Sequence, residues 1–191
     1  MKAPGYARVV NAILFKFLWP SCVVGAAFGQ WWIGAAVLAS LTLWQALPNH
    51  RVRGDIALFV LLLPVGLVLD TLWIQAGLLE YDLQWPWPGF APGWILFLWA
   101  GLALAINHCL LWMQQHLLLS GIIVAVASPL SYYSAAQIGA VTWTAPGWQV
   151  VLATGLSWAL LIPAVLYLAR TLRLNGRFEF AQLSPGPGAA R

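Results

Sequence analysis

One acidic residue stands inside an apolar stretch, "LVLDTLWIQAGLLEYD", which covers residues 67–82. A carboxylate near the centre of a membrane-spanning helix costs about 2.5–3.5 kcal/mol on insertion scales, and less toward the interface. An intramembrane carboxylate therefore indicates a site for proton exchange, cation binding or catalysis. The alternative is that Asp70 makes only a structural hydrogen bond between helices. The sequence leaves both interpretations open.

Other polar side chains are expected close to Asp70. With a rise of 1.5 Å per residue, Asp70 lies about 21 Å from the cytoplasmic start of its helix, in the outer third of the membrane. The polar residues expected at that depth are Tyr132, Tyr133 and Gln137. Glu80, Tyr81 and Asp82 are expected just outside the membrane. We expect Asp70 to share a hydrogen bond with Tyr132 or Tyr133, and these three residues are the candidates for catalysis.

A second polar group is expected in the cytoplasmic half of the membrane. Its members are Asn11, Lys16, Gln45, Asn107 and His108. Lys16 is about 10 Å from the cytoplasmic boundary, so its ammonium group is close enough to extend back to the interface. A salt bridge from Lys16 to Asp70 would have to cross roughly 10 Å of depth. We therefore expect Lys16 to be solvated rather than paired.

Metal and cofactor chemistry find little support in the sequence. His108 and His116 are eight residues apart, but no carboxylate or cysteine accompanies them at metal-ligand spacing. Cys22 and Cys109 are expected at different depths, which argues against a disulfide. The chain has no haem motif, phosphate-binding glycine loop or aspartate-rich diphosphate motif. We expect no bound cofactor and no metal site.

The composition indicates an integral membrane protein. Apolar residues make up 62% of the 191 residues and charged residues only 7%, against about 25% charged residues in soluble globular proteins. The 13 Trp and 5 Tyr suit the two membrane–water interfaces. The net charge of +4 comes from dispersed basic residues, so a nucleic-acid partner is not expected.

Six apolar segments are long enough to be membrane helices. The expected spans cover residues 9–28, 31–48, 56–76, 93–113, 117–140 and 148–169. Continuous apolar runs favour an all-α bundle over a β-barrel, whose strands would alternate polar and apolar residues. We expect residues 1–174 to form one transmembrane domain and residues 175–191 to be a disordered tail, because that tail is polar and rich in Pro and Gly.

The basic residues predict the orientation of the bundle. They precede the first span, separate the second from the third, and follow the sixth, whereas residues 77–92 and 141–147 contain no Lys or Arg. With six spans, all the basic segments fall on one side, which the positive-inside rule assigns to the cytoplasm. The sequence therefore predicts a multi-pass inner-membrane protein with both termini in the cytoplasm.

Small residues and a repeated tetrapeptide suggest how the helices begin and pack. Gly25, Gly29, Gly101 and Ala105 would allow close approach between helices, and packing within one chain is preferred over dimerisation. The sequence "APGW" precedes two of the spans. Pro suits the first turn of a helix and Trp anchors at the interface, so this repeat needs no duplication to explain it.

The segment "ASPLSYYSAAQIGAV", residues 127–141, resembles a family of small bacterial inner-membrane proteins classed only as a domain of unknown function. The resemblance extends to "LDTLWIQAGLL" and "PGWILFLWAGLALAINHCLLWM", and runs over roughly residues 9–170. Its markers are Asp70, Gly77, Trp94, Pro129, Leu130, Tyr132, Gly139 and Ala140. The resemblance implies a bacterial inner membrane but no reaction, because the family has no established activity.

Three functions remain open for such a protein. It could be an accessory protein without catalysis, an enzyme that acts on a lipid or isoprenoid with Asp70 as proton donor, or a carrier linked to protons or cations. An enzyme should have a pocket that opens to lipid near Asp70. A carrier should have a water-accessible path from Asp70 to the region of Asn107. Membrane lipid is the expected partner in all three cases.

Overall fold

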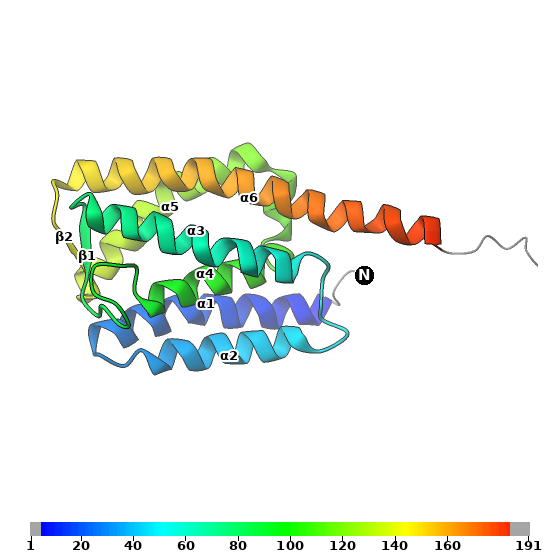
Figure 1. Cartoon of the computed structure of the whole chain (residues 1–191), viewed down its shortest axis with the longest axis horizontal. Helices are drawn as coiled ribbons and strands as arrows, with labels where there is room; N and C mark the ends of the chain where they lie inside the picture. The colour runs from blue at the N-terminus through cyan, green and yellow to red at the C-terminus, as the bar shows by residue number, and fades with distance from the viewer. Residues whose placement is uncertain (1–4, 184–191) are drawn as a thin grey trace, which may run out of the picture.

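The computed structural model describes the backbone of residues 5–183 and the side chains of residues 5–174. Within this part of the chain, six α-helices run along one long axis (Figure 1). The helices are α1 (Gly5–Ala27), α2 (Trp32–Ala46), α3 (Asp55–Gln75), α4 (Gly93–Ile106), α5 (Leu117–Ile138) and α6 (Gly147–Leu183). The all-helical fold class predicted from the apolar runs is confirmed.

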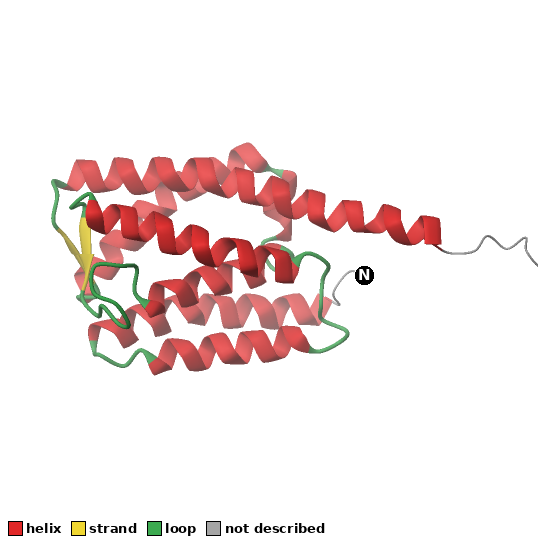
Figure 2. Ribbon diagram, viewed as in Figure 1, coloured by secondary structure: helices red, strands yellow, loops and turns green. Residues whose placement is uncertain are grey.

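A short β-ribbon covers one end of the bundle. Strand β1 (Leu79–Tyr81) pairs antiparallel with β2 (Val141–Trp143), and Tyr81 lies opposite Val141. Figure 2 shows the ribbon in yellow at the end where α3, α5 and α6 meet the connecting loops. The sequence analysis did not predict these strands. They tie the end of α3 to the α5–α6 connection.

Apolar helices of membrane-spanning length make up most of the fold. Four helices are long and apolar enough to cross a bilayer: α1, α3, α5 and the part of α6 up to Leu174. Helices α2 and α4 are apolar but shorter, with 15 and 14 residues. Large apolar side chains on the outside of the bundle, such as Ile56 and Leu118, are 79% exposed. A surface of this kind is suited to lipid rather than to water.

The helices pack in two groups. Helix α1 packs on α2 and α4, and α3 packs on α4, whereas α5 and α6 pack chiefly on each other. Large side chains such as Trp99 and Trp158 fill the space between the two groups, where their rings stack with centroids 4.8 Å apart. The α5–α6 hairpin therefore meets the remaining helices largely through aromatic side chains.

Gly101 allows close helix packing within the chain, as expected, and so does Gly66, whereas a β-carbon at Gly29 would meet nothing within 4 Å. A β-carbon at Gly101 would lie 2.1 Å from Leu18, and one at Gly66 would lie 2.3 Å from the Trp99 ring. Neither position tolerates a larger residue without displacing its neighbour. These contacts support the preference for packing inside one chain.

Two helices end at places that the sequence did not predict. Helix α4 ends at Ile106, not near residue 113, and is followed by the 3-10 turn η1 (Leu111–Gln115). Gln114 donates a hydrogen bond to the carbonyl of Ile106, so a side chain replaces a helical partner at that end. Helix α6 continues to Leu183, past the predicted start of a disordered tail, and Pro185 is the first proline after it. Residues 184–191, the rest of that tail, lie outside the described residues.

The two "APGW" segments both precede helices, but their tryptophans differ. Trp148 at the start of α6 is 65% exposed, as an interfacial anchor should be. Trp94 at the start of α4 is only 1% exposed and lies edge-on to Tyr81, with ring centroids 5.5 Å apart. The prediction that Trp94 anchors at the interface is therefore wrong, because the β-ribbon covers it.

Candidate functional site

Asp70 is buried on α3 near the end of the bundle that carries the β-ribbon. It lies five residues before Gln75, the last residue of the helix, which corresponds to about 8 Å along the axis. Its exposed fraction is 0%. A carboxylate removed from water needs hydrogen bonds to replace its hydration.

Three side chains from three other elements supply those hydrogen bonds. The Tyr81 hydroxyl, from β1, and the Tyr132 hydroxyl, from α5, both donate to Asp70 Oδ1, the latter at 3.1 Å. Trp99 Nε1, from α4, donates to Asp70 Oδ2 at 2.7 Å. We refer to these four residues as the Asp70 cluster. The predicted hydrogen bond between Asp70 and Tyr132 is confirmed.

The β-ribbon explains how Tyr81 reaches a buried carboxylate. Residues alternate between the two faces of a strand, so Leu79 and Tyr81 are buried while Glu80 is exposed. Burial, with the nearby Asp70 charge, raises the pKa of Tyr81 well above its usual value. The phenol thus stays protonated and acts as a donor. The sequence analysis expected Tyr81 outside the membrane, and the alternation in "LEY" was the signal that could have identified it.

Trp99 is held in place by its packing. Its ring fits against Gly66 of α3 and stacks on Trp158 of α6. A buried indole N–H normally finds an acceptor, and Asp70 is that acceptor here. Trp99 was missed because a tryptophan in an apolar run was interpreted as an interfacial residue.

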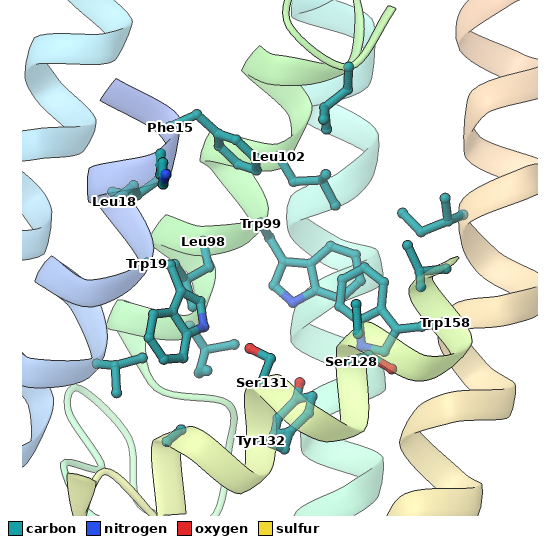
Figure 3. Close-up of a pocket in the computed structure, with 18 of the residues that line it drawn as sticks. Phe15, Leu18, Trp19, Leu98, Trp99, Leu102, Ser128, Ser131, Tyr132 and Trp158 are labelled. Carbon is teal, nitrogen blue, oxygen red and sulfur yellow. The ribbon is translucent and has the colours of Figure 1, made fainter. Parts of the chain in front are cut away.

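A large cavity adjoins the Asp70 cluster. Its volume is about 510 Å³, which is within the range of about 300–1,000 Å³ typical of small-molecule sites. Residues of α1, α4, α5 and α6 contribute most of its lining. Figure 3 shows Trp19, Trp99, Tyr132 and Trp158 around a common space between these helices. Tyr132 and Trp99 line the cavity, but Asp70 does not. The carboxylate thus reaches the cavity only through its two partners.

Lys16 is the charged residue in the lining of this cavity. Helix α1 begins at Gly5 and ends at Ala27, so Lys16 has eleven residues on either side. It is therefore at the centre of the helix, about 16 Å from each end. This position is deeper than the 10 Å expected from the sequence, because α1 begins four residues earlier than predicted. Lys16 does not join the polar group in which the sequence analysis placed it.

The other members of that group gather around a second carboxylate, Asp55, at the opposite end of α3. Asp55 Oδ2 accepts hydrogen bonds from the Val52 backbone N–H at 3.0 Å and from Gln45 Nε2 at 3.1 Å. Asn107 Nδ2 donates to Oδ1 at 2.9 Å. His108 Nε2 lies 2.9 Å from Oδ2 in a buried salt-bridge geometry. We refer to Asp55, Gln45, Asn107 and His108 as the Asp55 cluster.

A further set of polar side chains surrounds the Asp55 cluster. Asn11 donates to Gln45 Oε1 at 2.8 Å and to the Leu104 carbonyl at 3.2 Å, and Gln114 donates to Asn107 Oδ1 at 2.9 Å. The network joins α1, α2, α3 and α4 at one level. Asp55 was missed because the predicted third span began at residue 56, although an acidic residue in the first turn of a helix is a recognised signal.

Four predicted site residues lie away from the Asp70 carboxylate. Tyr133 is 53% exposed and meets Trp143 edge-on. Glu80 and Asp82 are exposed at the β-ribbon, where Glu80 accepts a hydrogen bond from Gln84. Gln137 is exposed near the end of α5. The structure therefore brings together Asp70 and Tyr132, but not these four.

Comparison with known proteins gives a family and no activity. Among the side chains of residues 5–174, no three His, Cys, Asp or Glu gather as they would to hold a metal ion. Neither the curated proteins nor the solved structures include a match to the chain. A family model described as "Protein of unknown function (DUF2878)" matches residues 8–164. The chain, whose sequence already resembled a membrane family of unknown function, therefore belongs to this family.

Proposed function

We propose that the protein spans the bacterial inner membrane six times, with both termini in the cytoplasm. The six helices share one axis (Figure 1). Arg8 at the start of α1 and Arg51 and Arg53 before α3 lie at the end of the bundle opposite the β-ribbon. The connections at the ribbon end, residues 28–31, 76–92 and 139–146, contain no Lys or Arg. This distribution follows the positive-inside rule.

We further propose that the protein takes a lipid or isoprenoid chain into the cavity and acts on it through Tyr132. One observation carries this proposal: Tyr132 lines the apolar cavity and also donates a hydrogen bond to the buried Asp70. An apolar cavity of about 510 Å³ can hold a hydrocarbon chain, and a hydroxyl in its wall can form a hydrogen bond with a polar or reactive group.

The geometry supports a division of roles within the Asp70 cluster. Tyr132 is the candidate catalytic residue, because it is the member with a hydroxyl on the cavity. Asp70 is a positioning residue, since it accepts from Tyr132 without lining the cavity. If the Tyr132 hydroxyl turns toward a bound molecule, Tyr81 and Trp99 still donate to Asp70. The cluster can therefore present a proton at Tyr132 while the carboxylate keeps two of its three hydrogen bonds.

The carrier alternative receives less support. It needs polar groups that connect Asp70 with the region of Asn107. Along the described part of α3, the buried residues between the two carboxylates are Leu58, Leu62 and Gly66. An apolar face of this kind offers protons or cations no route between the two clusters.

A test of lipid binding uses a cavity-blocking substitution. Leu98 is half-buried in the cavity wall, so Leu98→Trp should fill part of the space. Leu43→Trp is the control, because Leu43 on α2 is 69% exposed. After purification in a mild detergent, native mass spectrometry should find a lipid or isoprenoid on the wild type and on Leu43→Trp, and not on Leu98→Trp. Equal retention by all three proteins, or by none, would contradict the proposal.

A further inference from the structure

The cavity carries a positive charge that the proposed reaction does not use. Lys16 is at the centre of α1, where it is exposed on the surface of the bundle and also contributes to the cavity wall. A lysine at the middle of a membrane helix costs about 2.5–3.5 kcal/mol on insertion scales. The side chain of a lysine about 16 Å from either end of its helix cannot easily bring its charge back to water. Intramembrane charges of this kind generally serve a ligand or a partner.

No side chain among residues 5–174 neutralises Lys16. The chain has five acidic residues in total. Asp55 and Asp70 are held in their own clusters at the two ends of α3. Glu80 and Asp82 are exposed beside the β-ribbon, and Glu179 follows the part of α6 whose side chains are described. An anion near Lys16 would therefore have to come from a bound molecule.

The remaining polar groups of the cavity wall favour a ligand that accepts hydrogen bonds. The lining includes the hydroxyls of Ser128, Ser131 and Tyr132, but no carboxylate and no amide side chain. Ser128 donates to the Thr154 carbonyl and Tyr132 to Asp70. The indole N–H group of Trp94, also in the lining, is buried without a hydrogen-bond partner. Trp94 is only 1% exposed. A donor that is buried and unpartnered costs free energy unless a ligand accepts its hydrogen bond.

We propose that the ligand of the cavity is a long-chain carboxylic acid whose carboxylate pairs with Lys16. This inference rests on the proposed function, since it names the molecule that the cavity takes up. A carboxylic acid can enter an apolar site in its neutral form and ionise beside an ammonium group. A phospholipid headgroup remains at the interface, about 15 Å from the bilayer centre. The depth of Lys16 thus favours a free fatty acid over an anionic phospholipid.

The test compares ligands that differ only in the headgroup. Oleate, oleyl alcohol and dioleoylphosphatidylglycerol are titrated against the full-length protein in detergent, and dissociation constants are measured by displacement of a fluorescent fatty acid. Oleate should bind at least about tenfold more tightly than oleyl alcohol, because it gains a charge-assisted hydrogen bond. Lys16→Met should abolish this difference, and Lys16→Arg should keep most of it. Arg51→Met is the control, because Arg51 is an exposed cation outside the cavity.

Each result has a distinct meaning. Equal binding of oleate and oleyl alcohol to the wild type would overturn the pairing with Lys16 but leave chain binding in the cavity intact. A preference for oleate that survives in Lys16→Met would overturn it as well. Tighter, Lys16-dependent binding of the phosphatidylglycerol would assign a phosphate in place of the carboxylate. If no ligand binds the wild type, the proposed function itself fails. The wild-type comparison decides the question even if Lys16→Met does not fold.

Discussion

The two ends of α3 carry the same kind of side chain in different surroundings. Asp55 and Asp70 are both buried aspartates, with exposed fractions of 7% and 0%. Asp55 is bound by the backbone N–H of Val52, by the side-chain amides of Gln45 and Asn107, and by the imidazole of His108. Among these partners, only the imidazole can carry a charge. Asp70 is bound by two phenols and an indole. The partners of Asp55 come from different segments of the chain and form a structural network.

The partners of the two carboxylates differ in what else they contact. Gln45 also donates to the Leu104 carbonyl, and Asn107 also accepts from Gln114. Each of these side chains therefore forms a further hydrogen bond within the protein besides the one to Asp55. Tyr132, in contrast, has the cavity on its other side. Asp55 therefore binds side chains that are part of a larger network, whereas Asp70 binds a tyrosine that lines the cavity.

The first prediction tests whether the two clusters lie toward opposite sides of the membrane. Its expected effect is the largest, because each cysteine is either labelled or not labelled. The native cysteines are first removed by Cys22→Ala and Cys109→Ala. A single cysteine then replaces Gln84, near the Asp70 cluster, in one variant and Asn49, near the Asp55 cluster, in another. An impermeant maleimide added to intact cells should label Gln84→Cys and leave Asn49→Cys unlabelled until the membrane is opened. Labelling of both cysteines from one side would refute the six-span topology.

The second prediction concerns stability at Asp55. Asp55→Leu leaves Gln45, Asn107 and His108 without their common acceptor. A buried donor that loses its acceptor typically costs about 1–3 kcal/mol, so with three such side chains we expect a loss of about 3 kcal/mol. Thermal or denaturant unfolding in detergent measures the loss. A stability close to that of the wild type would show that the Asp55 network does not hold the helices together.

The third prediction separates stability from function at Asp70. Asp70→Asn keeps the shape of the side chain but places an NH₂ group where a donor now points, so a loss of about 1 kcal/mol is expected. Asp70→Leu should also fold, since leucine suits the membrane. Neither variant should complement a deletion strain at matched expression, because neither offers Tyr132 a carboxylate acceptor. Full complementation by Asp70→Asn would show that the position of Tyr132 does not depend on a carboxylate.

The smallest effect on stability is expected at Tyr132. Tyr132→Phe removes a single hydrogen bond, and such bonds in membranes contribute about 0.6 kcal/mol on average. The proposed role nevertheless predicts a loss of complementation, because the hydroxyl on the cavity disappears. Tyr133→Phe is a matched control, since Tyr133 is exposed and does not contact Asp70. If the two variants complement equally well, Tyr132 is not the catalytic residue.

Part of the candidate site could be predicted from the sequence. Asp70 could be identified because a carboxylate is conspicuous among apolar residues, and Tyr132 because helical rise estimates depth from position alone. The same estimate grouped Asn11, Gln45, Asn107 and His108. Trp99 could not be predicted, because its role depends on contact with Gly66 across two helices. Tyr81 depends on a strand whose pairing partner is about 60 residues away in the chain.

The sequence by itself determined the apolar helices, their approximate ends and the separation of two polar levels. These features follow from the local apolar pattern and from the cost of burying charge in a membrane. The tertiary structure alone decided which donors reach each carboxylate, where the cavity lies and that Lys16 lines it. Such features depend on the rotation of each helix about its axis and on packing between distant segments, which apolar residues on all sides of a helix do not specify.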